Sequence, residues 1–279
     1  MIDIYITLST LGIIQGITEF LPISSSGHLV LFEKISYFKK SLDSAGGESL
    51  LFINVILHIA TLMAILIYFR KDITTIIRGT LQGVANNDFK RSELHCFINI
   101  IVATIPAGII GLLFHDFFET LCSSHISVCL MLIINGFILL STKIIPLNNR
   151  KLGEIGFMRS IFIGCCQAFA IMPGISRSGT TITGGMISGL NPEESARFSF
   201  LMAIPTIAGA GLMEILRISK GNIPSELILP LLFAMILTMI IALISLKLLF
   251  SLIRIKKIAF FGYYTISVGV VILLFTILI

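Results

Sequence analysis

The stretch QGITEFLPISSSGHLVLF, residues 15–32, places ionisable and hydroxyl side chains inside an otherwise apolar run. Gln15 and Glu19 lie four residues apart, so they would share one face of a helix. A carboxylate there suits a divalent cation, because hard cations prefer oxygen ligands, and Gln15 offers a second, neutral oxygen. The alternative is a protonated or paired Glu19 that only holds helices together.

The same stretch carries a nucleophile and a base. Ser24, Ser25 and Ser26 are followed directly by Gly27 and His28, which combines hydroxyls, a flexible backbone position and an imidazole that titrates near neutral pH. A serine within reach of a histidine is the minimal activated nucleophile. A single serine in a membrane helix commonly bonds a carbonyl one turn earlier, and a lone histidine can serve packing alone. Three serines beside Gly-His favour catalysis.

A second interrupted stretch, CCQAFAIMPGISRSGTTITGGMISG (residues 165–189), contains one arginine, Arg177. An arginine inside a membrane needs an anionic partner, and its planar fork matches phosphate or carboxylate. That partner is either an anionic ligand or Glu19, in which case the pair is a plain salt bridge. We expect the neighbouring residues to offer hydroxyls and backbone N–H groups to an oxyanion at a half-helix N-terminus. These neighbours are Gly174, Ser176, Ser178, Gly179, Thr180 and Thr181.

Together the two stretches provide a carboxylate, a cation site, a nucleophile with a base, and an arginine clamp for an oxyanion. These are the parts that phosphoryl transfer requires. Because both stretches lie in apolar surroundings, we expect the substrate to be a phosphorylated lipid.

The whole chain has the composition of a membrane protein: 56% of its 279 residues are hydrophobic, 13% are charged, and the mean hydropathy is +1.00. Apolar runs of about 20 residues, the length of a bilayer span, recur along it, whereas the short alternating segments of a β-barrel do not. The net charge of +5 comes mostly from the connections between these runs, which suits anionic lipid headgroups and not nucleic acid. Only Asp3 is charged before the first apolar run, so we expect no cleaved signal peptide.

We predict a single integral membrane domain, residues 1–279, that is all-α and polytopic, with six transmembrane helices and two re-entrant helical hairpins. The expected spans cover residues 50–69, 95–114, 126–145, 197–216, 227–253 and 258–279. Segments 4–32 and 159–190 are apolar but broken by proline, glycine and polar residues. Irregular backbone at membrane depth needs protein or water around it, so each is expected to be a pair of half-helices. Five cysteines without a CxxC pair are expected to be small buried hydrophobic residues: Cys96, Cys122, Cys129, Cys165 and Cys166.

Basic residues mark one side of the predicted topology. The connections after the first, third and fifth spans are rich in Lys and Arg, so the positive-inside rule places them in the cytoplasm. They contain Arg70, Lys71, Arg78, Lys90, Arg91, Lys143, Arg150, Lys151, Arg159, Arg254, Lys256 and Lys257. Connections 115–125 (His115, Asp116, Glu119) and 217–226 are poorer in such residues. Hairpin 159–190 then enters from the cytoplasm and hairpin 4–32 from outside, although Lys39 and Lys40 count mildly against this.

The two interrupted segments match each other at a constant offset of 152 residues, without a gap. The matched positions are Gly12 with Gly164, Gln15 with Gln167, Ile23-Ser24 with Ile175-Ser176, and Ser26-Gly27 with Ser178-Gly179. Three spans separate the copies, and an odd number gives them opposite orientations. We therefore predict an inverted-topology repeat, with halves at about 1–145 and 150–279, whose broken helices mark the binding site.

With these residues assembled, the chain resembles the undecaprenyl-diphosphate phosphatases, the bacitracin-resistance family of bacterial inner membranes. QGITEFLPISSSGH resembles the family's (E/Q)xxxE segment with its Ser-Ser-x-Gly-His, and PGISRSGTTITGG resembles PGxSRSxxT. The resemblance covers essentially the whole chain. It implies hydrolysis of undecaprenyl diphosphate, or of shorter prenyl diphosphates, to the monophosphate and inorganic phosphate, which recycles the lipid carrier for cell-wall synthesis. It also implies a multi-pass protein of the inner membrane, a divalent cation (Mg²⁺ or Ca²⁺), bacitracin resistance and a homodimer.

The resemblance assigns catalytic roles to Glu19, Ser25, His28 and Arg177. Gln15 is the amide variant of an acidic-or-amide position, which leaves Glu19 as the main acidic metal ligand with Gln15 beside it. The positions expected to bind substrate are Gln15, Ser24, Ser26, Gly27, Gly174, Ser176, Ser178, Gly179 and Thr181.

Alternatives remain at this point. The nucleophile is either Ser25, deprotonated by His28 or Glu19, or a water molecule activated by the same groups. A lipid transporter or flippase is a non-enzymatic alternative, because inverted repeats with broken helices are transporter architecture, and a purely structural subunit would leave the polar stretches unexplained. The acid-phosphatase type of lipid phosphatase is rejected, because it needs a histidine after its Ser-Arg pair and none follows His125 here.

Overall fold

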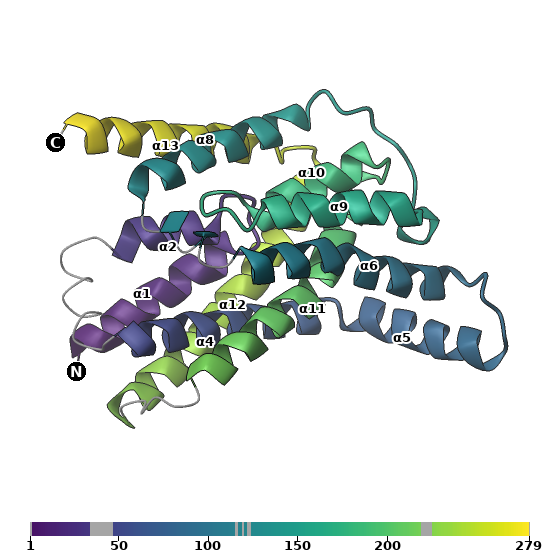
Figure 1. Cartoon of the computed structure of the whole chain (residues 1–279), viewed down its shortest axis with the longest axis horizontal. Helices are drawn as coiled ribbons and strands as arrows, with labels where there is room; N and C mark the ends of the chain where they lie inside the picture. Colours follow the sequence, from purple (N-terminus) through teal and green to yellow (C-terminus); the bar gives the residue numbers. More distant parts are fainter. Residues whose placement is uncertain are drawn as a thin grey trace.

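Long apolar runs form helices here because a chain in lipid has to satisfy its backbone N–H and C=O groups within each segment. The computed structural model describes residues 2–33, 47–114, 117–118, 120–121, 124–218 and 225–278. Within these ranges the regular elements are all helices, and the predicted all-α fold is confirmed (Figure 1). Lys39, Lys40, His115, Asp116, Glu119 and Cys122, on which sequence expectations rested, lie outside the described residues.

Helices occupy all six predicted spans. They are α4 (Gly47–Tyr68), α6 (Ser92–Leu113), α8 (His125–Ser141), α11 (Pro192–Ile218), α12 (Ser225–Arg254) and α13 (Phe260–Leu278). Among the described residues, four of these helices are long and apolar enough to cross a bilayer: α6, α11, α12 and α13. The pair α4 and α5 (Arg70–Ala85) is bent by 71° at its junction, and it would be a fifth spanning segment if the two helices are counted as one span. At 17 residues, α8 is shorter, about 26 Å at the usual helical rise.

The two interrupted segments each form a pair of half-helices, as predicted. The first pair is α1 (Ile2–Thr18) and α2 (Ser25–Glu33), and the second is α9 (Phe157–Phe169) and α10 (Arg177–Ile187). Between the half-helices lie short irregular breaks, residues 19–24 and 170–176. A short 3₁₀ helix, η1 (Leu152–Glu154), precedes the second pair.

Each pair folds back to the end from which it started. Arg159, near the start of α9, and Ile187, at the end of α10, line one cavity of about 520 Å³. At the opposite end of the molecule, Leu8 of α1, Leu29 of α2 and Leu227 of α12 belong to one buried cluster. Both pairs are therefore re-entrant hairpins.

The three basic connections meet at a single end of the molecule. Lys71 lines one cavity with Leu152 and another with Arg254, so the first connection touches the other two. Lys143 and Lys256 line a third cavity together. This common end is what the predicted topology requires, and its cytoplasmic orientation stays a prediction.

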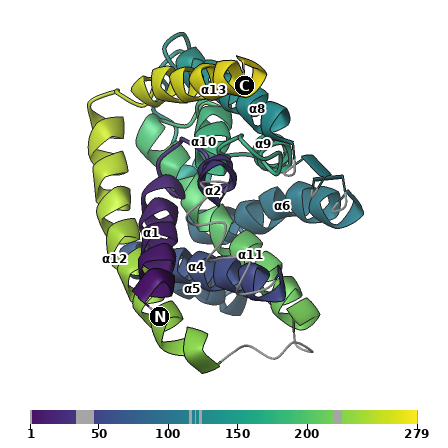
Figure 2. The same cartoon turned by 90° about the vertical axis from the view of Figure 1, so that its left-hand side faces the viewer.

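Helix packing follows the predicted inverted repeat (Figures 1 and 2). Helix α1 packs along α12 and its counterpart α9 packs along α6, while α4 packs on α12 as α11 packs on α6. The remaining counterparts, α4 with α11 and α8 with α13, pack on each other. Gly136 of α8 approaches Gly262 of α13, and Cys129 approaches Gly269, so this pair is antiparallel. Contacts of this kind are expected when a two-fold axis through the helix bundle relates the two halves.

Equivalent glycines make equivalent contacts in the two halves. A side chain at Gly12 would meet Ala234 and Thr238 of α12, and one at Gly164 would meet Ala103 and Pro106 of α6. These close approaches let the first helix of each hairpin lie directly against a spanning helix, as small residues do in membrane proteins.

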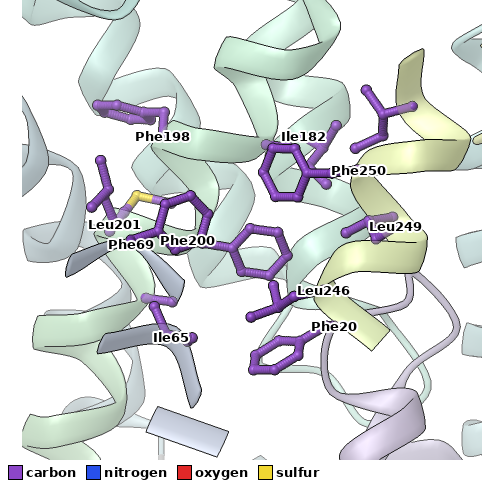
Figure 3. Close-up of a cluster of buried hydrophobic side chains, with 14 of the residues drawn as sticks. Phe20, Ile65, Phe69, Ile182, Phe198, Phe200, Leu201, Leu246, Leu249 and Phe250 are labelled. Atoms are coloured by element: carbon purple, nitrogen blue, oxygen red, sulfur yellow. The ribbon is translucent and has the colours of Figure 1, made fainter. Parts of the chain in front are cut away.

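Aromatic rings fill the centre of the bundle beside the first break (Figure 3). Phe20, at the break, meets Phe200 of α11 edge-on with ring centroids 5.5 Å apart. Phe200 in turn contacts Phe69 and Phe250, and all four rings are buried. Residue 20 therefore anchors the first break to the three helices around it.

The expectation for the cysteines holds in part. Cys96 and Cys129 are buried and Cys166 is half-buried, all three as free thiols, but Cys165 is exposed. The prediction for Cys165 is wrong because α9 is apolar on more than one face. Met158, Phe162 and Cys165 follow one another at helical spacing along the outer face of α9, and all three side chains are exposed, so this face would meet lipid.

Candidate active site

The two breaks meet at one carboxylate. Ser25 begins α2 and Arg177 begins α10, and these residues occupy the same position in the two repeats, 152 residues apart. Ser25 Oγ donates to Glu19 Oε2 over 2.8 Å, and Arg177 Nη2 donates to Glu19 Oε1 over 2.7 Å. Each carboxylate oxygen is thus held by the first residue of a different half-helix.

This site lies inside the protein. The Glu19 side chain is 7% exposed and that of Arg177 is 16% exposed, so the ion pair is largely desolvated. A buried carboxylate needs a charge partner and further hydrogen bonds, and Glu19 has both. The salt bridge considered for Arg177 in the sequence is therefore present. Arg177 also keeps its other terminal nitrogen, Nη1, buried and without a hydrogen-bond partner, so it has donors left for an oxyanion.

The half-helix N-termini are built alike in the two repeats. Ser24 caps α2 by accepting from the Gly27 N–H at 3.2 Å, and Ser176 caps α10 by accepting from the Gly179 N–H at 3.1 Å. Each capping hydroxyl also pairs with the hydroxyl two residues on: Ser26 in α2 and Ser178 in α10. Two helix N-termini, each positive in its dipole, therefore converge on the space around Glu19, which favours a multiply charged anion.

Gln15 is fully buried one turn before Glu19 and donates from Nε2 to Glu19 Oε2 over 3.1 Å. Its carbonyl oxygen, Oε1, is buried without a hydrogen-bond partner. An unpartnered amide oxygen one turn from a carboxylate is the kind of ligand that a hard cation prefers. No three His, Cys, Asp or Glu side chains gather as a metal site in the described part of the chain.

His28 has partners other than Ser25. Its Nδ1 lies 2.8 Å from the carbonyl oxygen of Ser24, which can only accept, so this nitrogen carries the proton. In the neutral ring, Nε2 accepts from the hydroxyl of Tyr264 over 2.9 Å, and the two rings stack. Of the two alternatives left open by the sequence, His28 and Glu19, Ser25 donates its hydrogen bond to Glu19. His28 instead fixes Ser24, which has a left-handed backbone with φ of 71°.

Other positions that were predicted to bind substrate contribute to packing and to the backbone structure around the breaks. A side chain at Gly174 would collide with Val128 of α8, and side chains at Gly27 and Gly179 would crowd Leu132 and Leu139 of the same helix, so these glycines allow the breaks to lie against it. Thr181 donates to the carbonyl oxygen of Arg177 and shares a 2.6 Å hydrogen bond with Ser199 of α11. It therefore anchors the first turn of α10.

Three residues of the site were not singled out from the sequence. His58 of α4 lies 3.0 Å from Gln15 Nε2, through its Nδ1. Asn135 of α8 donates to the Pro22 carbonyl oxygen over 3.1 Å and accepts from the Ser176 N–H over 2.9 Å, which ties the two breaks together. Tyr264 holds His28. Each is a polar side chain inside an apolar span, and that rarity was the available signal.

The fold and this site define a class: helical membrane proteins of two inverted halves, whose broken helices join at a buried carboxylate, arginine and serine. Residues 8–271 match the family described as "Bacitracin resistance protein BacA", and the chain belongs to that family. The family resemblance predicted from the two motifs is confirmed.

Individual relatives match over nearly the whole chain. An "Undecaprenyl-diphosphatase" of Halothermothrix orenii is 37% identical over 264 residues, which cover 95% of each chain. A protein of the same name from Methanosphaera stadtmanae is 37% identical over 282 residues, or 97% of each chain. Another from Caldicellulosiruptor bescii is 42% identical over 208 residues, 74% of each chain.

Proposed function

We propose that this protein is a membrane hydrolase that cleaves undecaprenyl diphosphate to undecaprenyl phosphate and inorganic phosphate. The observation that carries this proposal is the pair of hydrogen bonds on Glu19, which holds a serine hydroxyl and an arginine at one point between two helix N-termini. The relatives' name, undecaprenyl-diphosphatase, supplies the substrate.

Binding uses the arginine of the second half and the helix N-termini of both halves. The terminal phosphate lies between the N-termini of α2 and α10, where Arg177 Nη1 and the first backbone N–H groups of the two helices neutralise its oxygens. The prenyl chain stays in the bilayer, so the site at membrane depth receives only the headgroup. Shorter prenyl diphosphates carry the same headgroup and serve as substrates for the same reason.

Bond exchange begins at Ser25. Its Oγ attacks the terminal phosphorus while the proton passes to Glu19 Oε2, its hydrogen-bond acceptor at 2.8 Å. A bond forms between Oγ and phosphorus, the bridging phosphorus–oxygen bond breaks, and undecaprenyl phosphate leaves with the electron pair. Water then attacks the phosphorus of the phosphoserine, and its proton passes to an oxygen of the inorganic phosphate that forms. The bond between phosphorus and serine Oγ breaks, and Oγ leaves with the proton that Glu19 held.

A divalent cation, Mg²⁺ or Ca²⁺, would be held by Glu19 and Gln15 Oε1 and would supply charge neutralisation to the diphosphate. Glu19 would then bind the cation in addition to the protein groups whose hydrogen bonds its two oxygens accept.

This activity has a cellular setting that follows from the family. We place the protein in the bacterial inner membrane as a multi-pass homodimer, where it recycles the lipid carrier for cell-wall synthesis and confers resistance to bacitracin. A strain that lacks it and regains bacitracin tolerance with the wild-type gene, but not with a Ser25→Ala gene, would support that setting.

The decisive test is release of inorganic phosphate from farnesyl or undecaprenyl diphosphate by purified protein in detergent, with and without EDTA. We expect cation-dependent release that Ser25→Ala loses by at least about a hundredfold, the usual effect of losing a nucleophile's chemistry. Release that survives in Ser25→Ala would assign the attack to water. Tight binding of the lipid phosphate without any release would make the protein a lipid transporter instead.

A further inference from the structure

His58 holds the amide of Gln15, and the amide holds the carboxylate of Glu19. Gln15 Nε2 has two N–H groups and two acceptors, Glu19 Oε2 at 3.1 Å and His58 Nδ1 at 3.0 Å. Because an amide nitrogen only donates, Nδ1 of His58 is the acceptor in this contact. Both donors of the buried amide are therefore used, and its orientation is fixed from two sides.

A direct action of His58 on Glu19 does not fit the geometry. The distance from His58 Nδ1 to Glu19 Oε2 is 3.8 Å, beyond a hydrogen bond. The same nitrogen already accepts from Gln15, so it has no proton to donate to the carboxylate. Any influence of His58 on the reacting groups passes through Gln15.

The second repeat contains a similar contact, in which the glutamine amide bonds a neighbouring spanning helix without a carboxylate beside it. Gln167, the counterpart of Gln15, donates from Nε2 to the hydroxyl of Thr206 on α11 over 3.0 Å. Ile171 stands where the first repeat has Glu19. In both halves the glutamine Oε1 is buried without a partner. The hydrogen bond between hairpin and spanning helix thus belongs to the repeat, and only the first half connects it to a catalytic group.

We propose that His58 is a positioning residue for phosphate transfer. By accepting from Gln15, it keeps the other N–H of the amide on Glu19 Oε2, the oxygen that also accepts from Ser25, and leaves Gln15 Oε1 available to a ligand. Without that acceptor the amide can rotate, and the carboxylate that receives the serine proton loses its orientation. This inference rests on the proposed hydrolase activity and adds a residue on α4 to it.

Four variants test the inference by phosphate release from farnesyl diphosphate. His58→Leu removes the acceptor at similar volume, and we expect kcat to fall about tenfold, the size of effect expected of one hydrogen bond. His58→Gln restores an acceptor and should recover most of that loss. Gln15→Leu should lower kcat at least as much as His58→Leu does. The double variant His58→Leu/Gln15→Leu should have the same kcat as Gln15→Leu alone.

Thr206→Val is the matched control, because it removes the equivalent hydrogen bond in the half without a carboxylate. We expect a loss of thermal stability similar to that of His58→Leu, with kcat unchanged. An equal fall of kcat in Thr206→Val, or additive effects of the His58 and Gln15 substitutions, would make the contact between His58 and Gln15 a purely structural one and overturn the inference.

A second readout does not need turnover. Mg²⁺ with farnesyl diphosphate should raise the melting temperature of the wild type, His58→Gln and Thr206→Val alike, and raise it less in His58→Leu. An equal rise in His58→Leu would contradict the inference even if the wild type released no phosphate, whereas absence of wild-type release by itself would remove only the proposed function.

Discussion

Glu19 organises the site, since three side chains from three different helices donate hydrogen bonds to its two oxygens. Arg177 on one oxygen and Ser25 on the other are separated by 152 positions in the chain, and Gln15 comes from the preceding turn. The arginine serves two purposes: it balances a buried charge in the resting protein and offers Nη1 to a substrate oxyanion.

The first prediction concerns Arg177→Lys, which keeps the charge and loses the planar fork. A lysine holds Glu19 by a single point contact and has no second nitrogen for the oxyanion. We expect phosphate release to fall by about a hundredfold or more, in the range seen when a transition-state donor is removed. Arg177→Ala should be inactive and also less stable, because Glu19 would be left as a buried unpaired charge. Wild-type release by Arg177→Lys would show that charge alone suffices.

The second prediction separates the roles of Glu19 and His28. Glu19→Gln removes the proton acceptor of Ser25 and should nearly abolish release, whereas His28→Ala acts through the backbone at Ser24. Tyr264→Phe removes the outer hydrogen bond of His28 without touching the site, so it should reproduce a smaller part of the His28→Ala loss. If Tyr264→Phe behaves as the wild type while His28→Ala is inactive, His28 acts directly on the substrate.

The two breaks that form the site were largely predictable from the sequence. The side-chain contacts that link the breaks to each other and to the spanning helices were not. Proline, glycine and serine in apolar surroundings mark the two breaks, because such residues cannot continue a lipid-facing helix. Asn135 and His58 sit in regular spans, and periodicity in an all-apolar helix does not tell which face meets a neighbour. The sequence left His28 and Glu19 as alternative proton acceptors for Ser25, and spacing could not decide between them; Ser25 begins α2 and faces back toward Glu19.

The third prediction concerns Asn135, which joins the two breaks from α8. Asn135→Leu keeps the volume but leaves the Pro22 carbonyl and the Ser176 N–H without their side-chain partner, at a cost of about 1–3 kcal/mol for each buried group. We expect a lower melting temperature together with a fall in kcat, because the relative placement of Ser25 and Arg177 depends on this contact. Asn99→Leu, which removes one buried hydrogen bond to Ile155 far from the breaks, is the control that should lose stability alone.

The fourth prediction concerns Gly174, where the backbone has a φ of 98° and an added Cβ would lie 2.5 Å from the Val128 carbonyl oxygen. Gly174→Ala therefore forces the second break away from α8 and should reduce both stability and phosphate release. Gly108→Ala, at a helical position with open space around it, should be neutral or slightly stabilising. Equal behaviour of the two variants in a melting experiment would contradict this account.

At the scale of the whole molecule, the inverted halves have one structural consequence for orientation. The two hairpins enter from opposite ends, and the end that receives α9 and α10 is the one where the three basic connections gather. The positive-inside rule predicts that this is the cytoplasmic end, so the start of α12 is expected to lie outside. The two hairpins are copies of one repeat, and they enter the bundle from opposite ends and meet at the site.

The last prediction tests that orientation in intact cells, in a cysteine-free background. Lys90, in the first basic connection, and Glu226, at the start of α12, are both exposed, so each can be replaced by cysteine without disturbing a packed core. A membrane-impermeant maleimide added to cells should label Glu226→Cys and leave Lys90→Cys unlabelled until the membrane is permeabilised. The two positions lie at opposite ends of the molecule. Labelling of Lys90→Cys alone would therefore show that the orientation in the membrane is opposite to the predicted one, and that each hairpin enters from the other side.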